Sequence, residues 1–204
     1  MKNILIHCAM EKEGGKIAKK LNLEKIDTEE LLTVYSGIIK ETQINLIITG
    51  IGKQKTSIGL TKYLCKNKIP DLIINIGYAG STNTEIGKWI SIDKSYNLEW
   101  YIPGEEKYSM LDFGNQELET IEELEKLPCY SSETFVTKTD IKENVIFDME
   151  LHSVSIIADM YKIPLISMKK ISDNLNMDDY YKNIKTENIM ELESSVFYIE
   201  KYIK

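Results

Sequence analysis

Three acidic side chains stand where α/β proteins often place groups that exchange protons with a ligand. Glu13 lies just beyond a predicted first strand, Glu150 opens a predicted helix, and Asp173 follows a later predicted strand. Carboxyl groups can act as a general acid, as a general base or as hydrogen-bond acceptors. Because ligands of open α/β sheets bind at the carboxyl ends of the strands, these positions predict a small-molecule site at that edge.

Each carboxylate also has a purely structural explanation. An acidic residue at the start of a helix, such as Glu13 or Glu150, complements the positive end of the helix dipole. Ser172 and Asp173 after a strand are typical of the start of a turn. A single position therefore does not decide between a structural and a functional role. The surrounding motifs are needed for that decision.

Hydrophobic patterning predicts alternating strands and helices around these residues. Apolar runs predict strands at residues 3–8, 31–39, 43–49, 72–76, 88–95, 129–137 and 164–171. Helical spacing predicts helices through 17–21, at 54–66, at 116–127, from 150 to the residues before Pro164, and at 186–202, with loops at 97–114 and 177–183. This order predicts a three-layer α/β/α sandwich around a central mixed twisted sheet, with residues 1–204 forming a single domain.

The composition argues against several kinds of partner. Hydrophobic residues make up 43% of the chain and charged residues 28%, which indicates a compact fold. The net charge of −7 argues against a nucleic-acid or anionic-membrane partner and favours a small-molecule ligand. All 25 basic residues are lysines, so this chain cannot form a bidentate guanidinium clamp on phosphate.

The cysteines and histidines give no sign of a metal or disulfide site. Cys8, Cys65 and Cys129 lie far apart in the sequence, and His152 has no cysteine or histidine at ligand spacing. We therefore expect no metal and no cofactor. The apolar run near the N-terminus is too short for a signal peptide, and no apolar segment has the length of a membrane span. These features predict a cytoplasmic protein.

Five short motifs accompany the predicted strand ends and the helix that Glu150 opens. They are Ala-Met-Glu-Lys-Glu at 9–13, Thr-Gly-Ile-Gly-Lys at 49–53, Asn-Ile-Gly-Tyr-Ala-Gly at 75–80, Met-Glu at 149–150 and Ile-Ser-Asp at 171–173. Together they resemble the motifs of the 5'-methylthioadenosine/S-adenosylhomocysteine nucleosidases, which belong to the purine nucleoside phosphorylase superfamily. The resemblance implies a nucleoside phosphorylase-like fold and cleavage of the bond between adenine and ribose.

The resemblance also implies a role for each site residue. Asp173, oriented by Ser172, would protonate the departing purine, and Glu13 would deprotonate the attacking water. Glu150 would accept hydrogen bonds from the ribose hydroxyls. Three apolar residues would line the sugar and base pocket: Met149, Ile51 and Ala79. The implied partners are a small-molecule nucleoside and a second copy of the chain in a homodimer, and the implied pathway is methionine salvage.

Three features stand out against the family pattern. Tyr78 occupies the place of a small residue, so its ring either narrows the pocket or points away from it. The Ser-Gly-Asp-x-Phe loop that holds the purine is matched to residues 137–141, where Ile141 replaces the aromatic residue. Gly14 and Gly15 near a helix start cost about 1 kcal/mol each relative to alanine, which indicates a local reason for them. A phosphate cradle is conceivable, but the spacing favours a close backbone contact or a short irregular turn.

Three functions fit these residues. The first is hydrolysis of an adenine nucleoside, because the chain has no arginine to hold phosphate and a carboxylate at Glu13 would repel it. The second is a nucleoside phosphorylase or another purine nucleoside-cleaving relative. The third is a nucleoside-binding or structural protein in which the changed loop near Asp140 and the substitution at Tyr78 have abolished turnover.

Overall fold

The chain folds into strands and helices that alternate along most of its length. The computed structural model describes residues 1–100, 103–104, 115–185 and 191–203. The described strands are β1 (Lys2–Cys8), β2 (Glu24–Glu29), β3 (Leu32–Ile39), β4 (Thr42–Ile48), β5 (Leu72–Ser81), β6 (Trp89–Asn97), β7 (Asn115–Glu117), β8 (Glu125–Ser131), β9 (Ile146–Asp148) and β10 (Leu165–Asp173). The described helices are α1 (Glu11–Lys20), α2 (Lys53–Lys66), α3 (Leu151–Tyr161), α4 (Met177–Asn183) and α5 (Val196–Ile199), with the 3₁₀ turns η1 (Leu192–Ser195) and η2 (Glu200–Tyr202).

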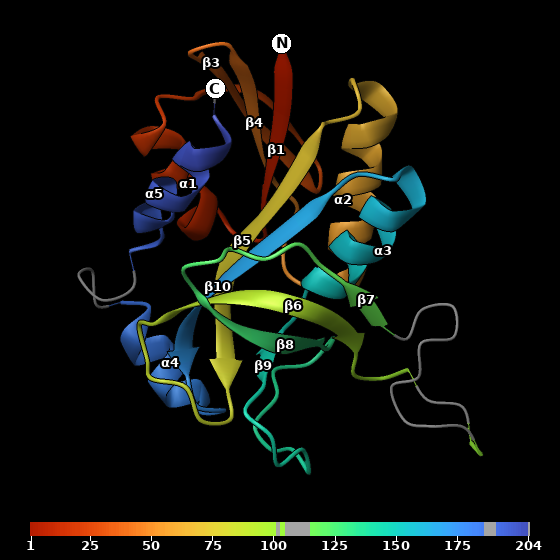
Figure 1. Cartoon of the computed structure of the whole chain (residues 1–204), viewed down its shortest axis with the longest axis vertical. Coiled ribbons are helices and arrows are strands. Elements are labelled where there is room, and N and C mark those ends of the chain that lie inside the picture. Colours follow the sequence, from red (N-terminus) through yellow and green to blue (C-terminus); the bar gives the residue numbers. More distant parts are fainter. Residues whose placement is uncertain (101–102, 105–114, 186–190, 204) are drawn as a thin grey trace.

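The long strand β5 organises the sheet (Figure 1). It pairs in parallel with β1 and with β10, and its last residues pair antiparallel with β9. Because β10 also pairs with β6, β6 with β8, and β8 with β9, these strands close a ring. Beyond β1, the strands β4, β3 and β2 extend the sheet in the other direction. The mixed sheet that the sequence predicts is confirmed, and the ring is an addition to that prediction.

Helices cover the sheet on both sides, with α1 and α5 on one side and α2 and α3 on the other (Figure 1). Two clusters of buried apolar residues correspond to these layers. Ile6 of β1 packs in the cluster that contains Ile17 of α1, and Leu5 packs in the cluster that contains Leu60 and Val154. Neighbouring strand residues point to opposite faces, so one strand supplies both layers. The predicted α/β/α sandwich is thereby confirmed.

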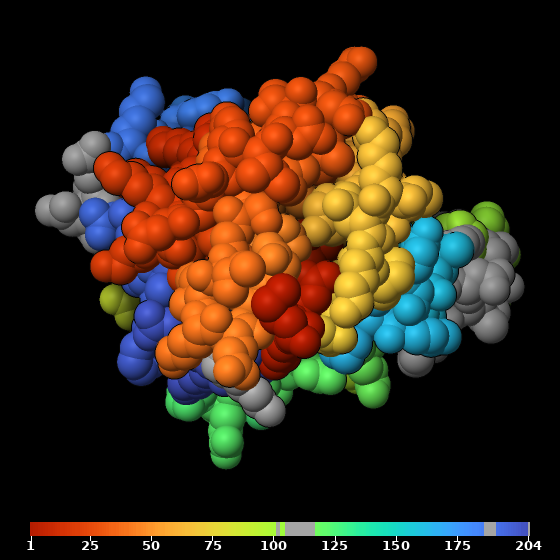
Figure 2. All heavy atoms as spheres, turned by 90° about the horizontal axis from the view of Figure 1, so that it is seen from above, coloured from red at the N-terminus to blue at the C-terminus, as the bar shows by residue number. Residues whose placement is uncertain are grey.

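The strands β2, β3 and β4 form much of the surface at the amino end of β1, beside the last turns of α2 (Figure 2). The sequence did not predict β2. Its side chains are almost all exposed, Ile26 by 62%, so no apolar alternation marks it. Charged residues along such an edge strand oppose pairing with another sheet.

Gly14 shows why glycines are present in the first helix. A Cβ at Gly14 would lie 2.9 Å from Leu46 Cδ2, so α1 approaches β4 more closely than alanine allows. A Cβ at Gly15 would meet only the side chain of Glu11. The geometry supports the close-contact interpretation for Gly14.

Two predicted elements in the second half of the chain are wrong. Residues 116–127 form β7, a turn and the start of β8 instead of a helix. Pairing with β6 and a bond from Ile121 N to Ser91 Oγ at 2.9 Å hold this segment extended, which overrides its helical spacing. Residues 177–183, predicted as a loop, form α4 because Asn176 accepts hydrogen bonds from Asp178 N and Asp179 N as an N-cap.

Two further predictions fall partly outside the described residues. The predicted rim loop at 97–114 includes 101–102 and 105–114, and the predicted C-terminal helix includes 186–190. The described remainder of that helix, from 191, consists of η1, α5 and η2 instead of one continuous helix. In the part of the chain that the structure describes, no helix is both long and apolar enough to cross a membrane.

Candidate active site

A cavity of about 390 Å³ opens at the carboxyl ends of β1, β5 and β10. The start of α3 and one side of α4 complete its wall. The cavity brings together eight of the nine residues that the sequence assigned to the site: Glu13, Ile51, Tyr78, Ala79, Met149, Glu150, Ser172 and Asp173. Ile141 is not among the residues that line it. The strand-end edge predicted from the sequence is therefore where the described cavity lies.

Glu13 is held at the first turn of α1 by backbone N–H groups. Its Oε2 accepts from Ala9 N at 3.0 Å and Met10 N at 2.9 Å, and its Oε1 accepts from Tyr78 N at 3.0 Å. A Cβ at Gly77 would lie 2.9 Å from Oε1, so glycine at that position of β5 makes room for the carboxylate. Burial raises the pKa of Glu13 above its usual value, although the three N–H groups act in the opposite direction.

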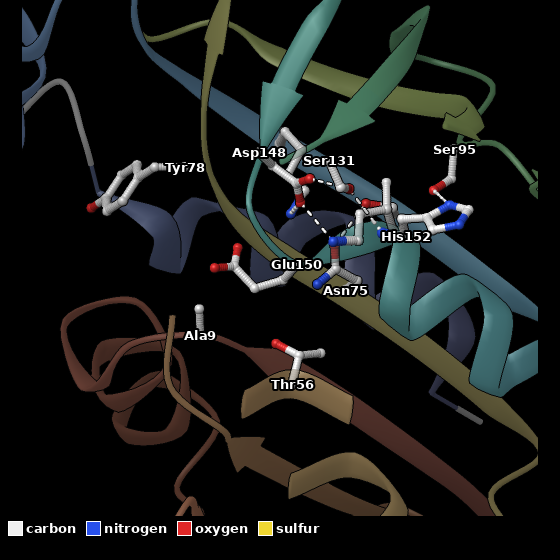
Figure 3. A network of polar contacts seen from close by, with 12 residues as sticks. Ala9, Thr56, Asn75, Tyr78, Ser95, Ser131, Asp148, Glu150 and His152 are labelled. Carbon is white, nitrogen blue, oxygen red and sulfur yellow. Dashed lines mark hydrogen bonds and ion pairs between the residues drawn. The ribbon is translucent and has the colours of Figure 1, made fainter. Parts of the chain in front are cut away.

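Glu150 immediately precedes α3 and reaches across to the turn before α2. Its Oε1 accepts a hydrogen bond from Gly52 N at 2.9 Å. Gly52 has a φ of +102°, a conformation that glycine adopts without strain. Burial, with the nearby charge of Asp148, raises the pKa of Glu150 to about 8. Figure 3 shows Glu150 beside the polar network around Asp148.

Asp173 is the last residue of β10, whereas the sequence placed it just past the strand. Ser172 Oγ donates to Asp173 Oδ2 at 2.8 Å, and Asn176 N donates to Oδ1 at 3.2 Å. The side chain is buried, and this burial raises the pKa of Asp173. A carboxyl group with a raised pKa can carry a proton nearer to neutral pH than an exposed one.

A buried ion pair, whose Asp148 also lines the cavity, adjoins these carboxylates and was missed in the sequence. Lys169 Nζ lies 2.7 Å from Asp148 Oδ2, with both side chains almost fully buried. Asp148 also accepts from Ser131 Oγ, as Figure 3 shows, and from Leu151 N. Although burial opposes both charges, the pair holds the pKa of Asp148 below its usual value and that of Lys169 above it. The signal in the sequence is a lysine inside the apolar run of β10.

The structure does not place Ile141 in the wall of the cavity. Strand β8 ends at Ser131, and the residues from Ser131 to Phe135 read Ser-Ser-Glu-Thr-Phe. This register matches Ser-Gly-Asp-x-Phe at its serine, acidic and aromatic positions, whereas the match to 137–141 lacks the aromatic residue. Phe135 lines the cavity and meets Tyr180 edge-on, with ring centroids 5.5 Å apart. Ile141 is half-buried, and its N–H donates to Thr139 Oγ1.

Tyrosines form part of the cavity wall. Tyr180 comes from α4, and burial together with the nearby carboxylates raises its pKa to about 12. Tyr78 also lines the cavity, packs against the core layer that contains Cys8, and points away from the polar network in Figure 3. Of the two possibilities that the sequence left open, its place in the cavity wall supports the one in which Tyr78 narrows the pocket.

The arrangement can bind a neutral ligand and stabilise positive charge that develops on it during a reaction. Glu13, Glu150 and Asp173 all line one mostly apolar cavity, and each has a pKa above its usual value. Groups of this kind are suited to donating a proton, accepting one, or holding hydroxyl groups. Phe135 offers an aromatic face to a planar base.

Comparison with known proteins agrees with this geometry. A 5'-methylthioadenosine/S-adenosylhomocysteine nucleosidase of Buchnera aphidicola subsp. Schizaphis graminum is 28% identical, over 92% of this chain and 90% of the relative. The structure of Arabidopsis thaliana 5'-methylthioadenosine nucleosidase in apo form is similar with a TM-score of 0.85 at 20% identity, over 100% of this chain and 96% of that one.

A second solved structure widens the range of similar proteins. A futalosine hydrolase mutant of Helicobacter pylori has a TM-score of 0.79 at 15% identity, over 98% of this chain and 97% of that one. The family model described as the phosphorylase superfamily matches residues 3–194, which include every residue of the cavity wall. The chain belongs to the phosphorylase superfamily.

Proposed function

We propose that the protein hydrolyses the N-glycosidic bond of an adenine nucleoside of the methylthioadenosine or S-adenosylhomocysteine type and releases adenine. The observation that carries this proposal is the convergence of Glu13, Glu150 and Asp173 on one cavity. Similarity to nucleosidases of that name supports it. The proposal covers residues 1–204 as one domain.

Each side chain has a task in this reaction. Asp173 donates a proton to the leaving purine, and Ser172 fixes the orientation of its carboxyl group. Glu13 takes a proton from the attacking water, which adds to the anomeric carbon as the bond to the base breaks. Glu150 accepts from the ribose hydroxyls and stabilises the positive charge that develops on the sugar. Phe135 takes the place at the base that the sequence had given to Ile141.

The positions of the lysines favour water over phosphate as the attacking group. Lys169 is buried in its pair with Asp148, and Lys170 Nζ donates to Glu191 O at 3.0 Å. Both are engaged with the protein, and the chain has no arginine. Ionised Glu13 would also repel a phosphate dianion. A phosphorylase, or a nucleoside-binding protein without turnover, is the alternative that the experiment below separates.

We also propose a homodimer and a cytoplasmic location. Ile51, at the cavity wall, is 45% exposed, and Ile58 on α2 is 54% exposed. Exposed apolar side chains beside a cavity suit a contact with a second copy. Sedimentation at micromolar concentration tests the dimer, and an active monomer would contradict it.

The function is tested by incubating purified protein with methylthioadenosine in phosphate-free buffer. We expect release of adenine and of the free thioribose. S-adenosylhomocysteine and adenosine, used in parallel, give the order of preference for the 5' substituent. Thermal melting with added adenine separates a binder without turnover, which would melt at a higher temperature but release nothing.

A further inference from the structure

Helix α2 begins without a capping side chain of its own. Its N-cap is Gly52, and its first turn contains no acidic residue. The first N–H groups of a helix have no partner inside the helix, and they attract negative charge. Two carboxylates from distant parts of the chain meet this helix end. Glu150 Oε1 accepts from Gly52 N at 2.9 Å, and Glu133 Oε1 accepts from Gln54 N at 3.1 Å.

Glycine at position 52 lets Glu133 approach the helix end. A Cβ added there would lie 2.9 Å from Glu133 Oε2. Glu133 therefore lies against the same turn that donates a hydrogen bond to Glu150. The two carboxylates occupy neighbouring places on one helix N-terminus.

The backbone around Glu133 is fastened to a third segment at the end of β6. Ser132 Oγ and Glu133 N both donate to Glu99 Oε1, at 2.6 and 2.9 Å. Glu99 also pairs with Lys53, the first residue of α2, and Lys53 Nζ donates to Asn97 Oδ1 at 2.7 Å. Loop 132–135 is thus tied to both β6 and α2.

Phe135 follows two residues after Glu133 and lines the cavity. Its ring position depends on the course of the loop, and that course is set by the contacts of Ser132 and Glu133. On the other side of the same helix end, Glu150 lines the cavity as well. The N-terminus of α2 is therefore shared by the loop that carries Phe135 and by Glu150.

We propose that Glu133 is a positioning residue that fastens loop 132–135 to the N-terminus of α2 and so fixes Phe135 relative to Glu150. The proposal rests on the proposed function for the identity of the ligand. Glu133 acts on binding of the base and has no part in proton transfer. Its effect is on the affinity of the site for adenine and its nucleosides.

The first experiment compares Glu133→Ala and Glu133→Gln with Glu143→Ala, an exposed glutamate in the same connection between β8 and β9. For Glu133→Ala we expect KM for methylthioadenosine to rise about five- to tenfold, as for loss of a helix cap, with kcat unchanged. The amide oxygen of Glu133→Gln can still accept from Gln54 N, so this variant should recover much of the affinity. Glu143→Ala should match the wild type.

The second experiment asks whether Glu133 acts through Phe135. The dissociation constant for adenine is measured by calorimetry for Glu133→Ala, Phe135→Ala and the double variant. We expect the double variant to bind no more weakly than Phe135→Ala, because the two changes remove the same contact. Additive losses, or a wild-type KM in Glu133→Ala despite a lower melting temperature, would overturn the proposal.

Calorimetry also separates this proposal from the proposed function. A wild-type protein that binds adenine but releases none from methylthioadenosine contradicts the proposed hydrolysis. The comparison of the Glu133 and Phe135 single and double variants by adenine binding still tests the role of Glu133. A wild type that binds no adenine contradicts both. A wild type that cleaves normally, alongside Glu133 variants identical to it, contradicts the role of Glu133 alone.

Discussion

Two buried polar clusters lie side by side in the sheet, and only one of them faces the cavity. The first is a chain of hydrogen bonds in which Ser167 bonds Asn75, Asn75 bonds His7, His7 bonds Thr49, and Thr49 lies 3.4 Å from Thr56. None of these residues is among those that line the cavity. The second cluster is charged and includes the Lys169–Asp148 pair with the cavity-lining Glu13, Glu150 and Asp173.

The first cluster is neutral. Burial, together with the charge of Lys169, lowers the pKa of His7 to about 3. Because Asn75 Oδ1 accepts from Ser167, its Nδ2 donates to His7 Nδ1, and His7 Nε2–H donates to Thr49 Oγ1. The polar groups of this first cluster therefore hydrogen-bond to one another inside the protein. A network of this kind fixes the relation between neighbouring strands.

The second cluster keeps carboxyl groups at a surface that a ligand can reach. The raised pKa values of Glu13, Glu150 and Asp173 make protonation possible where an exposed carboxylate would stay ionised. The difference teaches that burial and polarity alone do not mark a reactive site. A reactive site is marked by a shifted pKa combined with access to a cavity. Each prediction below tests either the charged or the neutral cluster.

The largest effect is expected for Asp173→Asn. The amide can still hydrogen-bond the purine but cannot deliver a proton, so turnover should fall about 100- to 10,000-fold while the fold is kept. Steady-state release of adenine and far-UV circular dichroism measure the two properties. Unchanged turnover would remove Asp173 from the role of acid.

The next effect is expected for Glu13→Gln, which removes the base and leaves the wall of the cavity in place. Turnover should fall by about 100-fold or more, while adenine binding persists. Calorimetry with adenine is the matching measurement. Loss of binding together with turnover would give Glu13 a structural role and weaken the distinction between the clusters.

Breaking the buried ion pair should act on stability. Lys169→Met leaves Asp148 buried without its counter-charge, which should cost about 3–5 kcal/mol of unfolding free energy in denaturant titration. The control is Lys88→Met, which breaks an exposed pair with Glu125 and should cost at most about 1 kcal/mol. Equal losses in both variants would contradict the importance of the buried pair.

A change in the neutral cluster should lower stability and leave turnover unaffected. His7→Leu leaves Asn75 and Thr49 without their shared partner, which should cost about 1–3 kcal/mol of stability. Adenine release per folded molecule should stay at the wild-type value. His7→Gln, with an amide that can bond both neighbours, should regain part of the stability. A fully stable but inactive His7→Leu would place this cluster in the reaction.

The smallest effect is a slope of stability with pH. The folded-state pKa of Glu150, about 8, lies above its ordinary value of 4.5, so the folded protein binds more protons than the unfolded chain between these values. Stability should therefore fall as pH rises through this window, by about 1 kcal/mol between pH 6 and pH 7. Glu150→Gln should flatten this slope in denaturant titrations, and an unchanged slope would contradict the shift.

The sequence was sufficient to predict the cavity residues whose motifs adjoin the ends of clearly marked elements. Glu13, Glu150 and Asp173 were found because strand β1, helix α3 and strand β10 are marked by clear apolar patterns. The short strands β7 and β9 and the start of β8 lack such marks. Pairing with β6 made a strand of residues that have helical spacing. Strand β8 ends at Ser131 and not at the predicted residue 137, and Phe135 lines the cavity where the sequence had placed Ile141.

Lys169 and Asp148 could not be paired from the sequence because their contact depends on how β10 and β9 are each placed along β5. The sequence did show Lys169 inside an apolar run, and a charge there requires a buried partner. The contact of Glu133 with the N-terminus of α2 likewise depends on how the fold brings α2 and the β8–β9 connection together, which the sequence does not show. Local sequence patterns do not predict contacts between distant segments.

The central claim is that water, activated at Glu13, attacks the nucleoside. The direct test is the initial rate of adenine release from methylthioadenosine across a phosphate titration from zero, with the sugar product identified by mass spectrometry. We predict a rate independent of phosphate and a free thioribose product. A rate that requires phosphate, or a sugar 1-phosphate product, would contradict the claim and establish phosphorolysis instead.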